Sequence, residues 1–213
     1  MSTKHLVPKE ITDLYDVYEW RNATGILLTA KPERWKEITS ALTEFRLLRS
    51  EVAAPGKNRS SVVDRFERPL KAAGWVEKQF NTSIVVDGSE TPSPTHKVDC
   101  FKDGVALEVE WNNKDPFFDR DLNNFRLLFD LRIIDVGIIV TRASHLQEIF
   151  VALGKGASYG NSTTHMGKLV PRLDGGGGGG CPVLVFAITR NLYVEDAITP
   201  VATPEAEERD EPE

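Results

Sequence analysis

The chain has 213 residues, of which 40% are hydrophobic and 27% charged, with a formal net charge of −6 and two cysteines. This length is sufficient for one well-packed domain, and two cysteines are too few for a disulfide framework. No apolar run is long enough to cross a bilayer, and the first residues do not form the apolar core of a signal peptide. We therefore expect a soluble cytoplasmic protein, not a membrane protein, with reduced cysteines.

The negative charge is concentrated at the carboxyl end. Residues 195–213 contain eight acidic residues and one basic residue, a net charge of −7, which leaves residues 1–194 at +1. A nearly neutral body can still bind nucleic acid, because phosphate contacts depend on where Lys and Arg cluster. We expect a single domain over residues 1–194 and an acidic, proline-containing tail over residues 195–213 that is disordered.

The first elements along the chain are extended runs and a helix. Residues 16–20 and 25–29 predict two strands that turn around Asn22. Pro32 suits the first turn of a helix, and apolar residues then recur at helical spacing as far as Leu48.

A second helix is predicted from Ser61 to Ala73. Ser60 is a suitable N-cap, Gly74 a suitable stop, and Pro69 should kink or interrupt the helix. After it, the sequence predicts a strand at residues 84–86 and a polar loop at residues 87–95.

The next segment predicts a hairpin that carries three carboxylates. Asp103-Gly104 favours a two-residue turn, because both residues tolerate the positive φ angles of a type I′ turn. This turn would place Asp99 directly opposite Glu108, with Cβ atoms about 4.5–5.5 Å apart. Strand alternation puts Ala106, Glu108 and Glu110 on one face, and the other, core-facing side consists of Val105, Leu107, Val109 and Trp111.

Like charges that face each other across two strands are destabilising, so the hairpin calls for a neutralising cation. Mg²⁺ takes oxygen ligands, commonly one or two carboxylates together with water and substrate phosphate oxygens. The alternative is a solvated acidic strand, with Lys97 and Glu110 forming a surface ion pair that contributes little. The hairpin residues alone leave both interpretations open.

The sequence Glu108-Val109-Glu110-Trp111, continuing into residues 112–118, resembles the BglII and BstYI restriction endonucleases. Their catalytic strand has the form acid-x-(Gln or Glu), about nine residues after a lone Asp. The resemblance covers about residues 14–190 and includes two upstream helices and later strands at 134–140 and 182–188. It implies an α/β fold with a mixed central β-sheet flanked by helices, the restriction-endonuclease-like core.

The resemblance also implies the activity, a Mg²⁺-dependent type II restriction endonuclease that acts as a homodimer on double-stranded DNA. Asp99 and Glu108 match the two metal ligands. Glu110 stands where many nucleases of the superfamily have Lys, so its role as a metal ligand or as the acceptor that orients the attacking water stays open. The relatives share a GATC core, which suggests a short palindromic site that contains GATC.

Residues 117–132 predict a helix with one apolar stripe, formed by Phe118, Leu122, Phe125 and Phe129. The stripe could pack inside the monomer or against the same helix of a second subunit, as the resemblance suggests. A two-fold dimer would place one acidic hairpin at each scissile phosphate of a palindrome.

Polar side chains that follow the hairpin are candidates for reading DNA, because amides and Lys reach base edges in the major groove. A second polar loop aligns with a recognition region of the relatives. We expect DNA contacts from Asn112, Asn113, Lys114, Asn123, Asn124, Ser158, Asn161, Ser162, Thr163 and Thr164.

Two further motifs receive no catalytic role. His96 lies an odd number of residues before Asp99, which predicts the opposite face of the strand. The glycines at 175–180 lack the Gly-Lys-Ser/Thr of a phosphate-binding loop and predict a flexible connector. Two other functions stay open: a DNA-binding protein of the same fold without catalysis, and a non-specific or repair metallonuclease.

Overall fold

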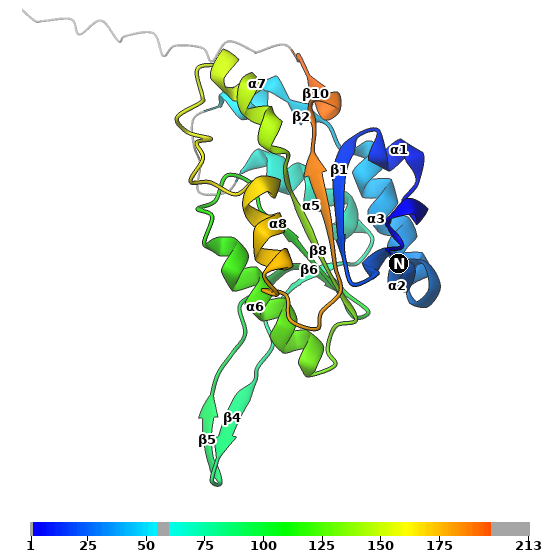
Figure 1. The fold of residues 1–213 in the computed structure, drawn as a ribbon, viewed down its shortest axis with the longest axis vertical. Coiled ribbons are helices and arrows are strands. Elements are labelled where there is room, and N and C mark those ends of the chain that lie inside the picture. The colour runs from blue at the N-terminus through cyan, green and yellow to red at the C-terminus, as the bar shows by residue number, and fades with distance from the viewer. Residues whose placement is uncertain (1, 55–59, 197–213) are drawn as a thin grey trace, which may run out of the picture.

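A mixed sheet of six strands forms the centre of the protein, with helices on both of its faces (Figure 1). The structure is a computed structural model that describes residues 2–54 and 60–196. The strand order is β1-β9-β8-β7-β6-β3, in which β7, β8 and β9 are parallel and the remaining pairs antiparallel. The α/β fold with a mixed central sheet is therefore confirmed.

The strands of this sheet are β1 (Tyr15–Trp20), β3 (Val76–Lys78), β6 (Val98–Lys102), β7 (Val105–Val109), β8 (Val136–Arg142) and β9 (Val183–Ile188). Two small sheets pair β2 (Leu47–Leu48) with β10 (Tyr193–Val194), and β4 (Ser83–Val86) with β5 (Ser89–Pro92). The α-helices are α1 (Lys9–Thr12), α2 (Ala23–Ala30), α3 (Pro32–Glu44), α4 (Arg49–Ala53), α5 (Ser61–Ala72), α6 (Phe117–Asp130), α7 (Gln147–Ala152) and α8 (Met166–Asp174). Three short 3-10 helices span Lys4–Leu6, Ser144–Leu146 and Arg190–Leu192.

The core is divided by the sheet into two apolar clusters. The larger cluster joins one face of the strands to helices from both ends of the chain, for example Leu107 to Ile38 and Phe66. The smaller joins the other face to α6 and α8, for example Ala106 to Phe125. Because both faces are covered, the central strands β7, β8 and β9 are buried along their whole length.

Three predictions for the first half of the chain are wrong. Residues 25–29 belong to helix α2, whose first turn is held by Glu19, since its Oε1 accepts a hydrogen bond from the Thr24 N–H (3.0 Å). Helix α3 ends at Glu44, because Leu47 and Leu48 pair with β10 instead. Pro69 does not interrupt α5, since it lies in the last turn and leaves only one turn to complete.

Other predictions for this half are confirmed. Strand β1 covers the expected residues 16–20, and α5 begins at Ser61 as expected and ends at Ala72, one residue before the predicted end. The Ser60 side chain accepts a hydrogen bond from the Val62 N–H, and Gly74 adopts a φ of +87° just after the helix.

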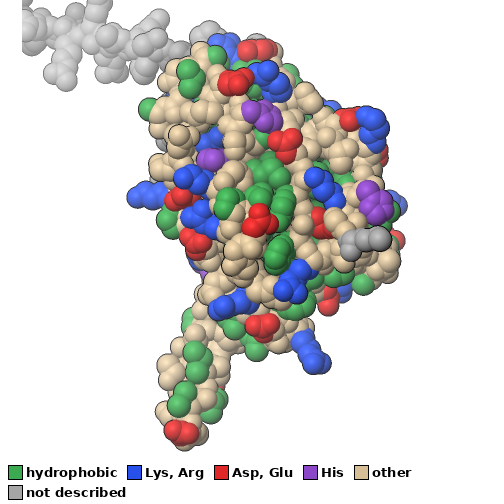
Figure 2. Space-filling view, viewed as in Figure 1, with side chains coloured by type: hydrophobic (Ala, Val, Ile, Leu, Met, Phe, Trp, Pro, Cys, Tyr) green, Lys and Arg blue, Asp and Glu red, His purple; other side chains and the backbone are tan. Residues whose placement is uncertain are grey.

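Residues 87–95 are not a loop throughout, because β5 pairs with β4 to form a second hairpin. We call this hairpin, residues 83–92, the arm. It projects away from the body of the protein and shows apolar side chains along its length (Figures 1 and 2). Ile84, Val85 and Val86 are 57%, 63% and 61% exposed.

The apolar stripe of α6 packs inside the monomer. Phe118, Leu122 and Phe125 are buried in the smaller cluster, and Phe129 packs against it. The first of the two positions considered for this stripe is therefore correct, and the stripe gives no surface for a second subunit.

The glycine run is a set of tight turns against α6, not a flexible connector. The Gly177 N–H donates to the carbonyl of Arg172 at 2.8 Å, and the Gly179 N–H donates to that of Gly176 at 2.9 Å. An added Cβ at Gly179 would lie 2.6 Å from the Arg126 side chain. An added Cβ at Gly177 would lie 2.9 Å from the Arg172 carbonyl oxygen of α8, so α6 and α8 together leave no room for side chains at Gly177 and Gly179.

Two remaining predictions concern the ends and the surroundings of the domain. Residues 197–213, most of the predicted tail, lie outside the described residues. Within the described part of the chain, no helix is both long enough and apolar enough to cross a membrane.

Candidate active site

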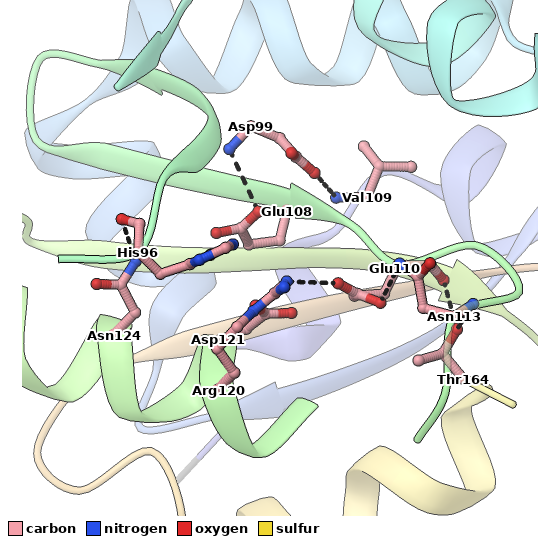
Figure 3. Close-up of polar contacts among 10 residues, drawn as sticks. All are labelled: His96, Asp99, Glu108, Val109, Glu110, Asn113, Arg120, Asp121, Asn124 and Thr164. Carbon is pink, nitrogen blue, oxygen red and sulfur yellow. Dashed lines mark hydrogen bonds and ion pairs between the residues drawn. The ribbon is translucent and has the colours of Figure 1, made fainter. Parts of the chain in front are cut away.

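The hairpin of β6 and β7 has the predicted register. Lys102 faces Val105, Phe101 faces Ala106, and Cys100 faces Leu107 on either side of the Asp103-Gly104 turn. Beyond these pairs, the two acidic side chains bond to the opposite strand (Figure 3). The Asp99 N–H donates to Glu108 Oε2 (3.2 Å), and the Val109 N–H donates to Asp99 Oδ2 (3.0 Å). The predicted register is thus confirmed for three residue pairs, and Asp99 and Glu108 meet just beyond them through bonds between side chains and backbone instead of as a further ladder pair.

The acidic face of this hairpin is buried. Glu108 and Glu110 are only 1% and 2% exposed, because α6 covers this side of the sheet. Lys97 pairs with Glu77 at 2.9 Å, not with Glu110. The alternative of a solvated acidic strand is therefore wrong.

Helix α6 adds two charged residues to the site that sequence reasoning missed. Arg120 Nη2 donates to Asp121 Oδ1 (2.8 Å) and to Glu110 Oε1 (3.2 Å). Asp121 has no exposed surface. The signal was its position three residues after Phe118 and four before Phe125, which places it on the stripe that faces the sheet.

Burial raises the pKa of each of the three buried carboxyl groups. The pKa of Glu108 lies well above its ordinary value because of burial and the neighbouring charges of Asp121 and Asp99. Burial and Asp121 together raise the pKa of Glu110 to about 9. The pKa of Asp121 is raised as well, mainly by burial, although Arg120 opposes the shift. Arg120 alone therefore supplies too little positive charge to keep all of these carboxyl groups ionised.

The donor set fits a hard divalent cation. Glu108 Oε1 and Asp121 Oδ2 are buried without a hydrogen-bond partner. Among residues 2–54 and 60–196, no three His, Cys, Asp or Glu side chains lie close enough together to form a metal site by themselves. Two carboxylates are nevertheless enough for Mg²⁺, which usually completes its shell with water and substrate phosphate oxygens. Asp99 and Glu108 are the two carboxylates that the sequence predicts for this role, and Asp121 adds a third carboxyl group with an unpartnered oxygen.

A cavity of about 230 Å³ lies over the acidic hairpin. His96 and Asp99 both line it, although the sequence predicts opposite faces for them. That prediction is wrong because β6 begins only at Val98, so strand alternation does not extend to His96. The full lining consists of Ser60, Val63, Glu67, His96, Asp99, Val109, Glu110, Trp111, Asn113, Phe117 and Arg120.

The two predicted DNA-reading regions lie side by side next to this cavity. Lys114 forms a β-bridge with Thr163, and the Thr164 N–H donates to the carbonyl of Asn113 (2.8 Å). Asn113 also reaches the acidic site, since its Nδ2 donates to Glu110 Oε2 (2.8 Å). Asn112, Asn113 and Thr163 are partly exposed, and the exposed residues are Lys114, Asn123, Ser158, Asn161 and Ser162.

Two of the predicted DNA contacts are buried in the protein. Asn124 is 4% exposed, and its Nδ2 donates to the carbonyl of His96 (3.3 Å). Thr164 has no exposed surface, and its Oγ1 accepts from the Asn113 N–H (3.2 Å). Their short polar side chains satisfy backbone groups, so we assign them a role in holding the site together instead of reading bases.

A buried arginine that the sequence analysis did not consider supports the second polar loop. Arg142, at the end of β8, is 1% exposed. Its Nη2 donates to the carbonyl of Tyr159 (2.9 Å) and to Thr163 Oγ1 (3.0 Å). The signal was a charged residue at the end of an otherwise apolar strand, since a buried guanidinium requires partners.

Comparison with known proteins agrees with this arrangement. A family model described as "Restriction endonuclease BglII/BglIII" matches residues 15–188, well over half of the chain. The matched range runs from β1 to β9 and includes the acidic hairpin, α6 and both polar loops. No curated protein matches the chain.

Proposed function

The chain belongs to the BglII/BglIII restriction endonuclease family, and we propose that it is a type II restriction endonuclease that hydrolyses double-stranded DNA at a short palindromic site. The observation that carries this proposal is the buried acidic hairpin, at which Asp99 and Glu108 meet beside a cavity and a pair of polar loops. The family supports a nuclease that acts on double-stranded DNA. The palindrome, the homodimer and the choice of Mg²⁺ are our proposals.

Asp99 and Glu108 would hold the cation, with Glu110 as a third candidate. When bound, a divalent cation lowers the pKa of water and stabilises charge on the phosphate. Both Glu108 and Asp99 accept backbone hydrogen bonds across the hairpin, which hold the two carboxylates near each other. The positive charge of a bound cation would also oppose the burial and the neighbouring acidic groups that raise the pKa of Glu108.

The remaining side chains would position the reactants. An oxygen of water forms a bond to phosphorus while the bond from phosphorus to the leaving deoxyribose oxygen breaks. Water releases a proton to solvent, and the leaving oxygen takes one up. We propose that Glu110, which Asn113 and Arg120 hold at 2.8 and 3.2 Å, accepts a hydrogen bond from the attacking water.

Base reading is proposed for the exposed residues of the joined loops. Lys114 stands only a few residues after the catalytic strand, and its backbone pairs with the second loop at Thr163. A base contact by Lys114 would therefore be connected through the backbone to both the acidic hairpin and the second loop. We expect Lys114→Ala to weaken discrimination at particular base pairs by about 1–3 kcal/mol. A uniform loss across all sequences would identify it as a phosphate contact.

The experiment that tests the function is digestion of unmethylated plasmid DNA with Mg²⁺ or EDTA, followed by sequencing of the ends. We expect discrete, Mg²⁺-dependent ends that share one palindrome with a GATC core, and none with Asp99→Ala. A smear of fragments would indicate a non-specific nuclease. Intact but retarded DNA would indicate a binding protein without catalysis. Light scattering of the purified protein tests the dimer, for which we expect twice the mass of the chain.

A further inference from the structure

The cavity over the acidic hairpin contains one guanidinium, that of Arg120 (Figure 3). Of the described residues that line this cavity, three are acidic, and Arg120 is the one Lys or Arg. A phosphodiester is an anion that gains further charge when water attacks it. A cavity whose acidic side chains outnumber its Lys and Arg side chains by three to one would repel this substrate unless a cation faced it.

We propose that Arg120 is a catalytic residue whose guanidinium contacts the scissile phosphate and stabilises the charge of its transition state. This inference rests on the proposed nuclease function. It assigns the positive charge of the site to a helix residue, since the strand position often occupied by Lys in this superfamily holds Glu110 here.

Arg120 is held in position by its neighbours on α6. Its Nε and Nη2 both donate to Asp121 Oδ1, at 2.9 and 2.8 Å. Its guanidinium carbon lies 4.3 Å from the ring centroid of Phe117, a cation–π distance. A buried carboxylate on one side and an aromatic ring on another fix the plane of the guanidinium before any substrate arrives.

The guanidinium also keeps donors for a ligand. The Arg120 side chain is 33% exposed, in contrast to Asp121, which has no exposure. Within the described part of the chain, Nη1 has no hydrogen-bond partner. The bond from Nη2 to Glu110 is the longest of the three at 3.2 Å. Nη1 can therefore donate to a phosphate oxygen directly, and Nη2 can join it by exchanging its long bond to Glu110 for a second phosphate oxygen, a paired geometry that guanidinium groups favour.

The first test is single-turnover cleavage of a duplex that carries the site found with plasmid DNA. We expect Arg120→Met to reduce the cleavage rate by about 100-fold or more, as for the loss of other donors to a developing oxyanion. Arg120→Lys should retain more activity, because it keeps the charge but not the paired donors. Arg65→Met is the matched control, since Arg65 also pairs with a carboxylate and is 37% exposed, but does not line the cavity.

A second test separates contact with phosphate from a structural effect. Binding is measured in EDTA to two duplexes, one of which has a neutral methylphosphonate at the scissile position. If Arg120 contacts that phosphate, Arg120→Met weakens binding of the normal duplex and leaves binding of the methylphosphonate duplex unchanged. An equal effect on both duplexes, or wild-type cleavage by Arg120→Met, would overturn the inference.

Thermal unfolding and a double variant distinguish a loss of catalysis from a loss of the fold. Arg120→Met leaves Asp121 without its cation, so thermal unfolding is recorded, and Arg120→Met/Asp121→Asn replaces the single variant if that one unfolds. The double variant removes both charges and should show the same losses in rate and binding. Absence of cleavage by the wild-type protein would contradict the proposed function and, with it, this inference. Cleavage by the wild type and by the double variant at equal rates would contradict the inference alone.

Discussion

The protein contains two hairpins with the same Asp-Gly turn and opposite surroundings. Asp87-Gly88 joins β4 to β5 in the arm, and Asp103-Gly104 joins β6 to β7. All four turn residues have positive φ angles, of 49°, 84°, 45° and 79°. Every strand residue of the arm is exposed, whereas every residue of β7 is buried.

The difference shows what a turn determines and what it does not. The Asp-Gly turn sets the local register in both hairpins, because its backbone geometry joins two strands in only one way. Burial depends on the neighbours instead: β6 and β7 pair with β3 and β8, while β4 and β5 form a sheet of their own. The same local chemistry therefore produces a buried acidic site in one place and a projecting arm in the other.

The two hairpins should differ most in how a substitution in each one affects the rate of DNA cleavage. Glu108→Ala removes a proposed metal ligand, so we expect the cleavage rate to fall by more than about 100-fold, the upper cost of losing an outer-shell partner of a metal. Glu90→Ala, on the arm, is the matched control and should cleave at the wild-type rate. Gel assays of plasmid cleavage check both variants, and an active Glu108→Ala would contradict the assignment of the metal site.

The two hairpins should also differ in their contribution to stability. Leu107 has no exposed surface, so we expect Leu107→Ala to reduce the free energy of unfolding by about 2–5 kcal/mol. Val85 is 63% exposed, and Val85→Ala should change the free energy of unfolding by no more than about 0.5 kcal/mol. Urea denaturation measures both values. A large loss for Val85→Ala would show that the arm is covered in solution, for example by a second subunit.

Replacement of the turn glycines tests how similar the two turns are. Gly88→Ala and Gly104→Ala should each cost about 1–2 kcal/mol, because both positions require positive φ. A Cβ at Gly104 would also lie 2.5 Å from Asp135 Oδ2, whereas a Cβ at Gly88 has no atom within 4 Å. Asp135 would have to leave its ion pair with Lys31, so we expect the larger loss for Gly104→Ala in urea denaturation.

Of these substitutions, Glu110→Gln should have the smallest effect on stability and cleavage at neutral pH. The pKa of Glu110 is about 9 in the folded protein against 4.5 ordinarily, so the folded state keeps a proton that the unfolded state releases. The contribution of protonated Glu110 to the free energy of unfolding is fully present below pH 4.5. It is lost as the pH rises toward 9, so the free energy of unfolding falls over this range. Glu110→Gln should make this decline shallower and should retain cleavage.

Urea denaturation at pH 5 and pH 8 in EDTA measures the slope for both proteins. An identical decline in the variant would show that Glu110 is ionised in the folded protein. Complete loss of cleavage in Glu110→Gln would instead show that its negative charge takes part in the reaction.

What the sequence predicts well is what short segments determine. The register around Asp103-Gly104 and the cap of α5 at Ser60 depend on a few adjacent residues, and both are confirmed. Residues 25–29 were assigned to a strand because their run of apolar residues fits either structure. Their helix depends on Glu19, which reaches forward from β1.

The acidic site shows the same limit. Asp99 and Glu108 come from one hairpin, so the Asp-Gly turn predicts that they meet, and the family resemblance singles them out as candidate ligands. Arg120 and Asp121 come from α6, which packs against the face of the sheet that carries these carboxylates. Tertiary contacts between α6 and the sheet determine this packing. The burial of Glu108 and Glu110 was missed for the same reason.

The six consecutive glycines have a consequence for how this gene can change. The composition of this run alone would suggest that its length is unimportant. Yet Gly177, Gly179 and Gly180 each face a different partner, namely Arg172, Arg126 and Phe129. A seventh glycine would move these positions out of step with α6 just before β9 enters the sheet, so the length of the repeat should be under purifying selection even though every unit in it is the same.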